Sequence, residues 1–449
     1  MKPFTLEEIA ASCGGEYIGE ESLKSTQITS VERDSRQIKD GSLFLAIKGE
    51  RVDGHDYVEK CFESGAVCAV CERKIPNASK PYILVESTLE AVKKIAEAYR
   101  LKFDIPVVGV SGSVGKTSTK EMLYAVLSQR FLTHKTQGNL NNELGVPLTI
   151  LAMPENTQAA VIEMGISDFG EMSRLAKIVK PTVCVLTIIG CCHLENLGDR
   201  DGVCKAKTEM FDYASKDAEF VLNGDDDKLS QINDVNGKKP IFFGLDSKNR
   251  YYAENIQNNG EGGVLCTLCF DGAKINATIP AIGSYMVSNA LAAAAVGKHL
   301  GLSNEQIKNG VEAYKTVGSR ANVINTGKIR IIDDCYNANP TSVKASLATL
   351  ANFEGRRVAI LGDMKELGKD ELKLHFETGL EAKKNADEVV AIGELSKELA
   401  KAAEGSWFES IDEAKPEIAA KIKSGDTVLV KASHSMQFEK IVEFLREKF

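Results

Sequence analysis

The amino-acid sequence predicts an α/β protein of three domains, built around a central, mainly parallel sheet. Its 449 residues suggest about three domains at roughly 100–200 residues each. In the second and third parts of the chain, short apolar segments alternate with helical ones, which is typical of parallel sheets. Most polar motifs directly follow a predicted strand, and ligands bind at that edge of open parallel sheets.

A small α/β N-terminal domain is predicted over residues 1–104. Thr5 and Glu8 form a capping-box pattern that predicts a short helix after them. Segments 41–49 and 65–72 contain apolar runs suited to buried strands. Segment 86–102 has helical apolar spacing, with Leu89, Val92, Ile95, Ala96 and Tyr99 on one face. The first boundary is placed at 104–106, where Asp-Ile-Pro disfavours helix.

The central domain is predicted over residues 105–318. Apolar strands are expected at Val107–Val110, Ala159–Ile162, Val183–Ile189 and Phe220–Leu222, with helices between them. The glycine-rich loop after the first strand should lead into a helix over Thr119–Ser128. Segment 236–280 carries IFFG, GGVLCTLCF and AKINATIP between turn residues, which predicts an added antiparallel part. The apolar helix Met286–His299 should close this domain.

A second doubly wound, Rossmann-like unit is predicted over residues 319–449. Its strands are expected at Ile329–Ile332, Val358–Leu361, Val389–Ile392 and Thr427–Val430. Helices are expected at about 341–352, 370–384, 396–403 and 436–447.

Composition excludes several classes of protein. The chain has 55 basic and 63 acidic residues and a net charge of −8, whereas nucleic-acid binders usually have a basic excess. No apolar run reaches the roughly 18 residues of a membrane span, and the N-terminus lacks a secretory pattern, so a cytoplasmic protein is expected. Its eleven cysteines are then free thiols. Their spacing also does not suit zinc, because Cys68-x-x-Cys71 and Cys266-x-x-Cys269 lie in strands that point alternate residues to opposite faces.

The most specific motif is a phosphate-binding loop between a strand and a helix. It consists of Gly109, Val110, Ser111, Gly112, Ser113, Val114, Gly115, Lys116, Thr117 and Ser118. Backbone N–H groups and the helix N-terminus favour phosphate there, Lys116 can reach the terminal phosphates, and Thr117 can hold Mg²⁺. The generic pattern wants glycine at position 110 and finds Val110, so Gly112 takes that part. The alternative is a glycine-rich turn without a ligand.

Three further residues have both a chemical and a structural interpretation. Glu163 ends a strand and can hold Mg²⁺, or it can cap a helix or form an ion pair. His193 follows the strand before CCHLENLG, where a lone histidine is more often structural than a ligand. Lys207 opens a helix and, on sequence physics alone, is a solvated surface lysine.

Four polar loops also stand out. The amide-rich segment 137–147, with Asn139, Asn141 and Asn142, suits a polar ligand or a turn. In the segment DDCYNANP (333–340), Asn339-Pro340 can simply cap a helix. The segments Asp34-Ser35-Arg36 and Asp53-Gly54-His55 are each compatible with ordinary turns.

Taken in order along the chain, these motifs resemble those of the Mur ligases, the ATP-dependent amide-forming enzymes of peptidoglycan precursor synthesis. DSRQIKDGSLFLAIKGERVDGHDY is similar to the family's uridine-nucleotide-binding segment, and SGSVGKTS to its phosphate loop. QGNLNNELGVP, EMG, HLENLG and AKTEMF follow at family-like positions. DDCYNANP and LGDMKELG resemble the branch of the family that adds D-alanyl-D-alanine rather than the branch that adds a single amino acid (MurE).

The resemblance implies a reaction. ATP phosphorylates the terminal carboxylate of a UDP-N-acetylmuramoyl-tripeptide, whose third residue is lysine or diaminopimelate. The amine of D-alanyl-D-alanine then attacks the acyl phosphate, giving the amide, ADP and phosphate. A magnesium-dependent, monomeric enzyme without membrane insertion is expected.

The resemblance also implies roles for single residues. Lys116 stabilises the transferring phosphoryl group, and Thr117 and Glu163 hold one magnesium. His193 and a carbamate on Lys207 hold a second. Nucleotide contacts fall to Asn289, Arg320, Asp334 and Asn337, and substrate contacts to Ser35, Arg36, Asp53, Gly54, His55, Asn139, Asn141 and Asn142. The third domain should close on ATP through a hinge near Gly318-Ser319.

Five residues depart from the family pattern. Ile188 stands where an amide is usual, Tyr285 where histidine is frequent, and Ala432, His434 and Ser435 alter a loop near the C-terminus. These departures motivate an alternative, a catalytically impaired homologue that binds nucleotide without turnover. The remaining alternative is a MurE-like ligase with a different amino-acid specificity.

Overall fold

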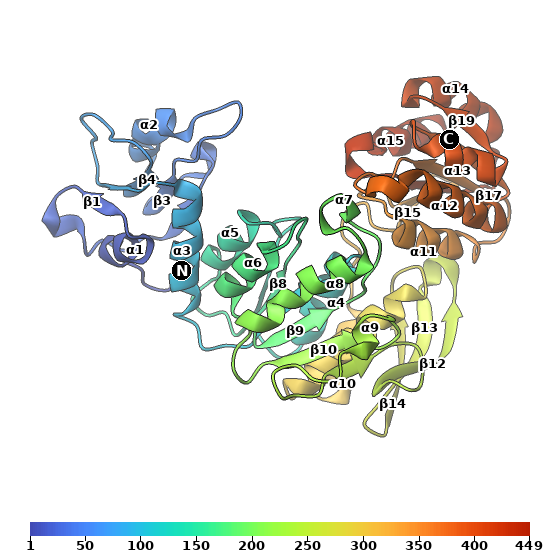
Figure 1. The fold of residues 1–449 in the computed structure, drawn as a ribbon, viewed down its shortest axis with the longest axis horizontal. Helices are drawn as coiled ribbons and strands as arrows, with labels where there is room; N and C mark the ends of the chain where they lie inside the picture. The colour runs from blue at the N-terminus through green and yellow to red at the C-terminus, as the bar shows by residue number, and fades with distance from the viewer.

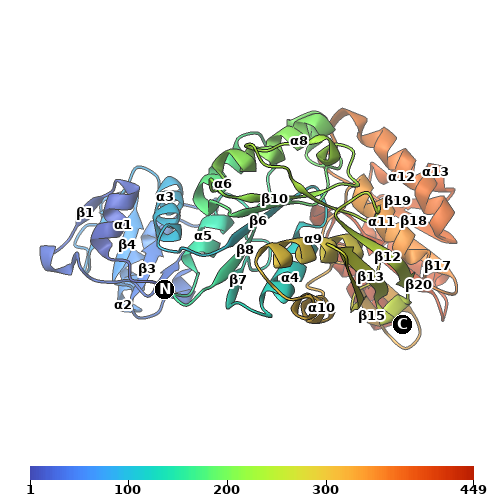
Figure 2. The same cartoon turned by 90° about the horizontal axis from the view of Figure 1, so that it is seen from below.

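A computed structural model describes residues 1–449 and places three sheets in three lobes along the chain (Figure 1). The N-terminal and C-terminal lobes stand apart on either side of the central one, and Figure 2 shows the same order from below. The predicted three-domain α/β class is confirmed. None of the helices combines the length and apolar character needed to cross a membrane.

The N-terminal sheet has five strands in the order β1-β5-β4-β3-β2, all parallel except β1. Thr5 and Glu8 form the expected capping box on α1. The strands are β1 (Glu16–Ile18), β2 (Ser30–Glu32), β3 (Ser42–Leu45), β4 (Cys68–Cys71) and β5 (Tyr82–Leu84), and the helices α1 (Leu6–Cys13), α2 (Val58–Glu63) and α3 (Thr88–Arg100).

Helix α3 also docks this domain onto the central one. Tyr99 Oη donates a hydrogen bond to Met153 O at 2.9 Å, and Arg100 Nε donates to Val179 O at 2.8 Å. The predicted apolar face is buried from Val92 to Tyr99. Placing Leu89 on it was wrong: Leu89 is 44% exposed because it lies at the start of α3, where the helix borders the cleft between the domains.

The central sheet has nine strands in the order β14-β13-β12-β11-β10-β9-β6-β8-β7. Strands β6, β8 and β9, which carry the polar motifs, are adjacent and parallel, so their carboxyl ends meet at one edge. The strands are β6 (Val107–Ser111), β7 (Thr133–Lys135), β8 (Ala159–Glu163), β9 (Val183–Leu186), β10 (Glu219–Asn223), β11 (Ile241–Phe243), β12 (Tyr251–Asn258), β13 (Val264–Phe270) and β14 (Ala273–Ile279).

Helices cover both faces of this sheet. One apolar core includes residues of α5 (Gly145–Leu151), α6 (Glu171–Val179) and α8 (Arg200–Thr208). The other includes residues of α4 (Lys116–Leu127), α9 (Tyr285–His299) and α10 (Asn304–Glu312). The short helix α7 (Leu194–Leu197) adds Leu197 to the first core and lies on the side of the C-terminal lobe (Figure 1).

The structure corrects three predictions in this domain. Strand β11, expected to be antiparallel, pairs in parallel with β10, so the antiparallel part begins only at β12 and β13. Strand β12 was missed because its sequence, YYAENIQN, is mostly polar. The predicted strand 183–189 ends at Leu186, and helix α4 begins three residues before the predicted Thr119, as soon as the phosphate loop ends.

The C-terminal sheet has six strands in the order β15-β16-β20-β17-β18-β19, all parallel except β15. The four predicted strands and four predicted helices are confirmed, and β15, β19 and α14 were missed. The strands are β15 (Asn322–Asn325), β16 (Arg330–Asp333), β17 (Arg357–Gly362), β18 (Glu388–Ile392), β19 (Ser406–Phe408) and β20 (Thr427–Lys431). The helices are α11 (Pro340–Leu350), α12 (Glu371–Asn385), α13 (Ser396–Ala403), α14 (Ile411–Lys421) and α15 (Glu439–Lys448).

Candidate active site

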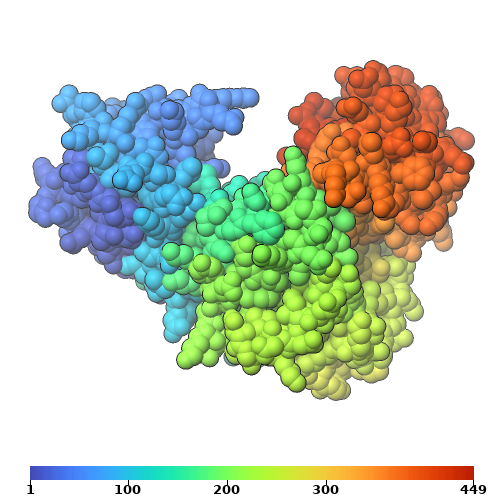
Figure 3. All heavy atoms as spheres, viewed as in Figure 1, coloured from blue at the N-terminus to red at the C-terminus, as the bar shows by residue number.

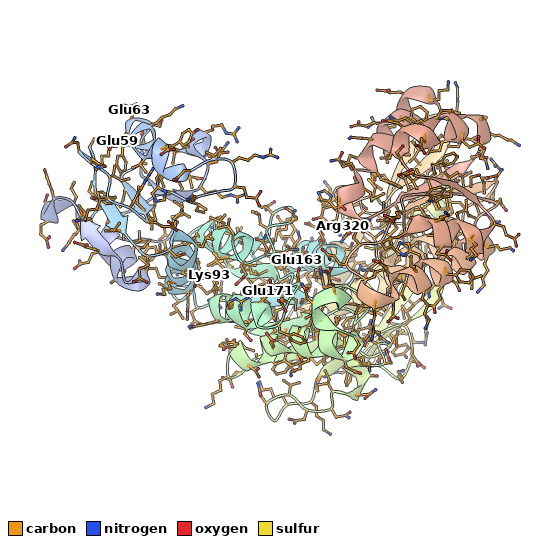
Figure 4. The ribbon with its side chains drawn as sticks, turned by 45° about the horizontal axis from the view of Figure 1, so that its top comes forward. Glu59, Glu63, Lys93, Glu163, Glu171 and Arg320 are labelled. Atoms are coloured by element: carbon orange, nitrogen blue, oxygen red, sulfur yellow. The ribbon has the colours of Figure 1, made fainter.

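A cleft of about 960 Å³ is lined by residues of all three lobes. In the space-filling view the molecule is hollowed between the N-terminal and C-terminal lobes, above the central one (Figure 3). Figure 4 shows Lys93, Glu171, Glu163 and Arg320 one after another across this region, from the side of the N-terminal lobe to the side of the C-terminal lobe. The cleft therefore lies over the carboxyl edge of the central sheet.

The phosphate loop depends on two glycines in positive-φ conformations. Gly112 has φ +147°, and a Cβ there would lie 1.9 Å from Thr187 Oγ1. Gly115 has φ +83° and begins α4 without a side-chain cap. Because no side chain occupies them, the first N–H groups of α4 are available to an anion. Glycine at 112 rather than 110 is thus required by the path of the loop beside Thr187.

Lys116 and Thr117 open α4 at the cleft. Lys116 Nζ donates a hydrogen bond to Gly112 O at 2.9 Å, so the side chain lies folded back over the loop. Thr117 Oγ1 donates to Glu163 Oε2 at 2.9 Å, across the tips of β6 and β8. Asn141 Nδ2 donates to Glu163 Oε1 at 2.7 Å. The amide-rich loop and the phosphate loop therefore meet at one carboxylate.

Lys120 is a residue of this site that sequence reasoning missed. Its side chain is buried, with Nζ 3.6 Å from Glu163 Oε2 and 3.2 Å from Glu121 Oε1. Lys120 follows Lys116 by one helical turn, so the two side chains lie on the same face of α4, the face that meets the strand tips. This spacing is the signal in the sequence that could have identified it. The buried ammonium offsets the charge of Glu163, which is only 1% exposed.

His193 lies at the start of α7 with φ +51°. Its Nδ1 is 2.6 Å from Glu366 Oε2 in the C-terminal domain. Burial lowers the pKa of His193, while Glu366 opposes that shift and the charges of Lys207 and Lys116 reinforce it. The neutral imidazole that a metal ligand requires is therefore favoured.

Lys207 is buried at 1% exposure, so its interpretation as a solvated surface lysine was wrong. No hydrogen bond or ion pair engages its ammonium, and burial lowers its pKa from 10.5 to about 8. Cys192 and Glu171 lie close enough to oppose that shift, and Lys116 reinforces it. An unpaired buried amine of this kind is unusual outside functional sites.

These groups fit magnesium. No three His, Cys, Asp or Glu side chains converge at one point. Mg²⁺, however, usually takes only one or two carboxylates and completes its shell with water and phosphate oxygens. The Thr117 hydroxyl and the Glu163 carboxylate meet these needs at the phosphate loop, and His193 with an anionic group on Lys207 would offer a second pair.

The C-terminal domain presents a compact polar cluster to the cleft. Lys431 Nζ donates to Asp334 Oδ2 at 2.6 Å and to Asn337 O at 3.0 Å. The guanidinium of Arg320 lies 3.9 Å above the ring of Tyr336. Asn289 on α9 accepts a hydrogen bond from Thr119 Oγ1 at 2.9 Å, beside the phosphate loop. All four residues predicted for nucleotide contacts, Asn289, Arg320, Asp334 and Asn337, line the cleft.

The substrate residues predicted in the N-terminal domain do not line this cleft. Asp34 and Asp53 each cap a 3₁₀ turn that contains the predicted residues Ser35, Arg36, Gly54 and His55. His55 Nε2 accepts a hydrogen bond from the backbone N–H of Glu72 at 2.8 Å. Of the three asparagines, Asn141 and Asn142 line the cleft and Asn139 is exposed outside it.

Comparisons with known proteins agree with this arrangement. Three family profiles match in order: the Mur ligase family catalytic domain at residues 27–100, the Mur ligase middle domain at 110–297, and the Mur ligase glutamate ligase domain at 319–434. The UDP-N-acetylmuramoyl-tripeptide–D-alanyl-D-alanine ligase of Bacillus subtilis (strain 168) is 36% identical over 456 residues, covering 99% of this chain and 98% of that protein. The chain belongs to the Mur ligase family.

Solved structures of the Mur ligase family share the fold over the whole chain. Crystal structure I of MurF from Acinetobacter baumannii matches with a TM-score of 0.92 at 30% identity and covers 100% of both chains. MurF ligase from Thermotoga maritima, solved in complex with ADP, matches with a TM-score of 0.83 at 29% identity over 93% of this chain and 97% of that one.

Three of the five departures of this Mur ligase from the family pattern lie in or beside the cleft, whereas Ala432 is buried in a core of the C-terminal domain. Ile188 and Tyr285 both line it, and the Ile188 carbonyl accepts a hydrogen bond from Ser113 N at 2.8 Å. Burial raises the pKa of Tyr285, so its phenol stays protonated. His434 lies against Tyr336, with ring centroids 5.6 Å apart.

Proposed function

We propose that this Mur ligase joins D-alanyl-D-alanine to UDP-N-acetylmuramoyl-tripeptide, with conversion of ATP to ADP and phosphate, in the synthesis of peptidoglycan precursors. The observation that carries the proposal is the full-length similarity to ligases of that name, together with a phosphate loop and a buried carboxylate at one interdomain cleft. It is further proposed to act as a monomer in the cytoplasm.

The reaction has two steps. A terminal carboxylate oxygen of the tripeptide attacks the γ-phosphorus of ATP, and the bond to the bridging oxygen breaks to release ADP. The amine of D-alanyl-D-alanine then attacks the acyl carbon. Phosphate leaves with the electrons of the C–O bond, and the amine loses a proton to solvent.

The residues of the cleft divide this work with Lys207, which is buried and does not line the cleft. Lys116 would give up its hydrogen bond to the Gly112 carbonyl and donate to the γ-phosphate instead. There its ammonium would stabilise the negative charge that develops on the transferring phosphoryl group. Thr117 and Glu163 would hold one magnesium ion, while His193 and Lys207 would hold another. Magnesium supplies neutralisation of phosphate charge. Arg320 and the cluster of Asp334, Asn337 and Lys431 would grip the nucleotide from the opposite side.

Lys207 would act as a carbamate in this scheme. Its neutral amine attacks the carbon of CO₂ and releases a proton, which turns a buried cation into an anionic oxygen ligand. Burial and the absence of a partner for the ammonium support this role, because an uncompensated buried charge is costly.

Three domains are proposed. Residues 1–104 form the domain that binds the UDP-sugar, residues 105–318 the central ATP-binding domain, and residues 319–449 the C-terminal domain. The first would hold the UDP-sugar through Ser35, Arg36 and the Asp53–His55 turn. Asn139, Asn141 and Asn142 would line the path of the tripeptide toward the phosphate loop, with Glu163 held by Asn141.

The C-terminal domain is expected to close on ATP. Gly318 has φ +66° and nothing within 4 Å of its Cβ position, as suits a hinge. Small-angle scattering should show a smaller radius of gyration when an ATP analogue and UDP-tripeptide are added together. An unchanged radius in the wild type would contradict closure.

The function is tested by incubating the protein with ATP, Mg²⁺, UDP-N-acetylmuramoyl-tripeptide and D-alanyl-D-alanine. Phosphate release that requires both substrates, with a product whose mass contains the dipeptide, is the expected result. Addition of a single amino acid instead would indicate a MurE-like specificity. ATP binding without any turnover would indicate the impaired homologue that Ile188 and the altered C-terminal loop suggest.

A further inference from the structure

A contact between the central and C-terminal domains engages the Nδ1 side of His193. Glu366 Oε2 lies 2.6 Å from Nδ1, and the backbone N–H of Leu194 donates to Glu366 O at 3.0 Å. His193 and Glu366 have φ values of +51° and +65°. Neither is glycine, so the surrounding structure must hold both in this sparsely populated conformation.

The loop that carries Glu366 is held rigidly by the C-terminal domain. It follows β17, and His375 Nε2 accepts a hydrogen bond from the backbone N–H of Met364 at 2.9 Å. Buried Asp363 accepts hydrogen bonds from Ser396 N at 2.8 Å and Ser396 Oγ at 2.9 Å. The Glu366 side chain itself is 58% exposed and has no ionic partner other than His193. The loop thus presents one carboxylate to the neighbouring domain, where it contacts only His193.

We propose that Glu366 is a positioning residue for His193: it accepts the Nδ1–H hydrogen bond, fixes the tautomer and the ring plane, and leaves Nε2 free to bind magnesium. Metal-binding histidines commonly donate their other N–H to a carboxylate in this way. The inference rests on the proposed function. It adds that His193, a magnesium ligand in the central domain, is oriented by Glu366 of the C-terminal domain. The metal site is therefore complete only while these two domains are in contact.

Manganese binding to the full chain tests the proposal. Mn²⁺ is titrated by electron paramagnetic resonance in the presence of a non-hydrolysable ATP analogue and bicarbonate. Glu366→Gln should weaken the second bound Mn²⁺ by about tenfold or more and leave the first ion and the melting temperature unchanged. Glu195→Gln is the matched control, because Glu195 lies two residues from His193 and has no hydrogen bond or ion pair.

Kinetics give a second readout. Glu366→Gln should raise the apparent KM for Mg²⁺ more than it lowers kcat at saturating Mg²⁺, and Glu366→Asp should recover part of the loss. Equal or tighter Mn²⁺ binding in Glu366→Gln overturns the proposal, since the pair would then be a docking contact or a competitor of the metal. A wild type that binds only one Mn²⁺ overturns both this inference and the second metal site of the proposed function. Equal or tighter Mn²⁺ binding by Glu366→Gln, in contrast, overturns this inference and leaves the proposed function intact.

Discussion

Replacing Lys116 with alanine is expected to lower kcat by about 1000-fold, a loss on the order of that seen when a preorganised transition-state donor is removed. Lys116 is the only basic residue in the first turn of α4, since Lys120 one turn later is paired with Glu163 and Glu121. The single hydrogen bond of Lys116, to Gly112 O, is one that a phosphate oxygen can replace. Its charge matters most when negative charge builds on the transferring phosphoryl group. Binding of an ATP analogue should therefore weaken much less than turnover, which calorimetry and steady-state kinetics can separate.

The control for Lys116 is Lys373→Met, which removes an exposed lysine on α12 far along the chain from the phosphate loop. Both variants should melt within a few degrees of the wild type, because neither side chain packs in a core. A Lys116→Ala enzyme that retains most of its kcat would show that the phosphoryl group is stabilised by other groups, and the assignment of the loop would fail.

Sequence reasoning located the site where chemistry-bearing residues follow strands. The phosphate loop leaves the end of β6, Glu163 is the last residue of β8, and His193 follows β9. The structure places these three strands side by side. Parallel topology alone brings such tips together. Glu366 also follows a predicted strand, in the motif LGDMKELG, but nothing in the sequence linked it to His193, because it lies in a different domain and a charged loop residue is usually solvated. Only the docking of two domains reveals its contact with His193.

The fold was predictable where burial leaves a pattern. Helix α3 and the strands of the two doubly wound sheets have apolar runs or faces of the expected length. Strand β12 was missed because its second half, Glu254–Asn258, is mostly polar and partly exposed and contains residues that are depleted in strands. The direction of β11 was misjudged because three apolar residues carry no information about the neighbouring strand. Burial of Lys207 depends on packing from several elements, which no local pattern encodes.

Replacing Lys207 with methionine is expected to abolish measurable turnover and, at the same time, to stabilise the fold. The loss follows from removing the carbamate that would hold magnesium. The stabilisation follows from burial, which lowers the pKa of Lys207 from 10.5 to about 8, a difference worth roughly 3 kcal/mol. An apolar side chain of similar length fits the same buried space without that cost.

The pH dependence of this gain can be worked out from the two pKa values. Below pH 8 the lysine is protonated in both states, and its burial costs the folded state the full amount. Between about pH 8 and 10.5 only the unfolded chain binds the proton, so wild-type stability rises with pH and the advantage of methionine shrinks. Urea unfolding in CO₂-free buffer at pH 7 and pH 10 should therefore show a smaller difference at pH 10.

Lys205→Met separates this effect from a general change in helix α8. Lys205 lies on the same helix but is exposed, so its replacement should leave turnover and unfolding at both pH values nearly unchanged. Bicarbonate should raise wild-type activity in CO₂-depleted buffer and do nothing for Lys207→Met. A Lys207→Met enzyme that turns over would show that the carbamate is not needed, and the second magnesium would then need another anionic ligand. A stability gain that does not fade toward pH 10 would show that the gain does not come from removing a buried charge.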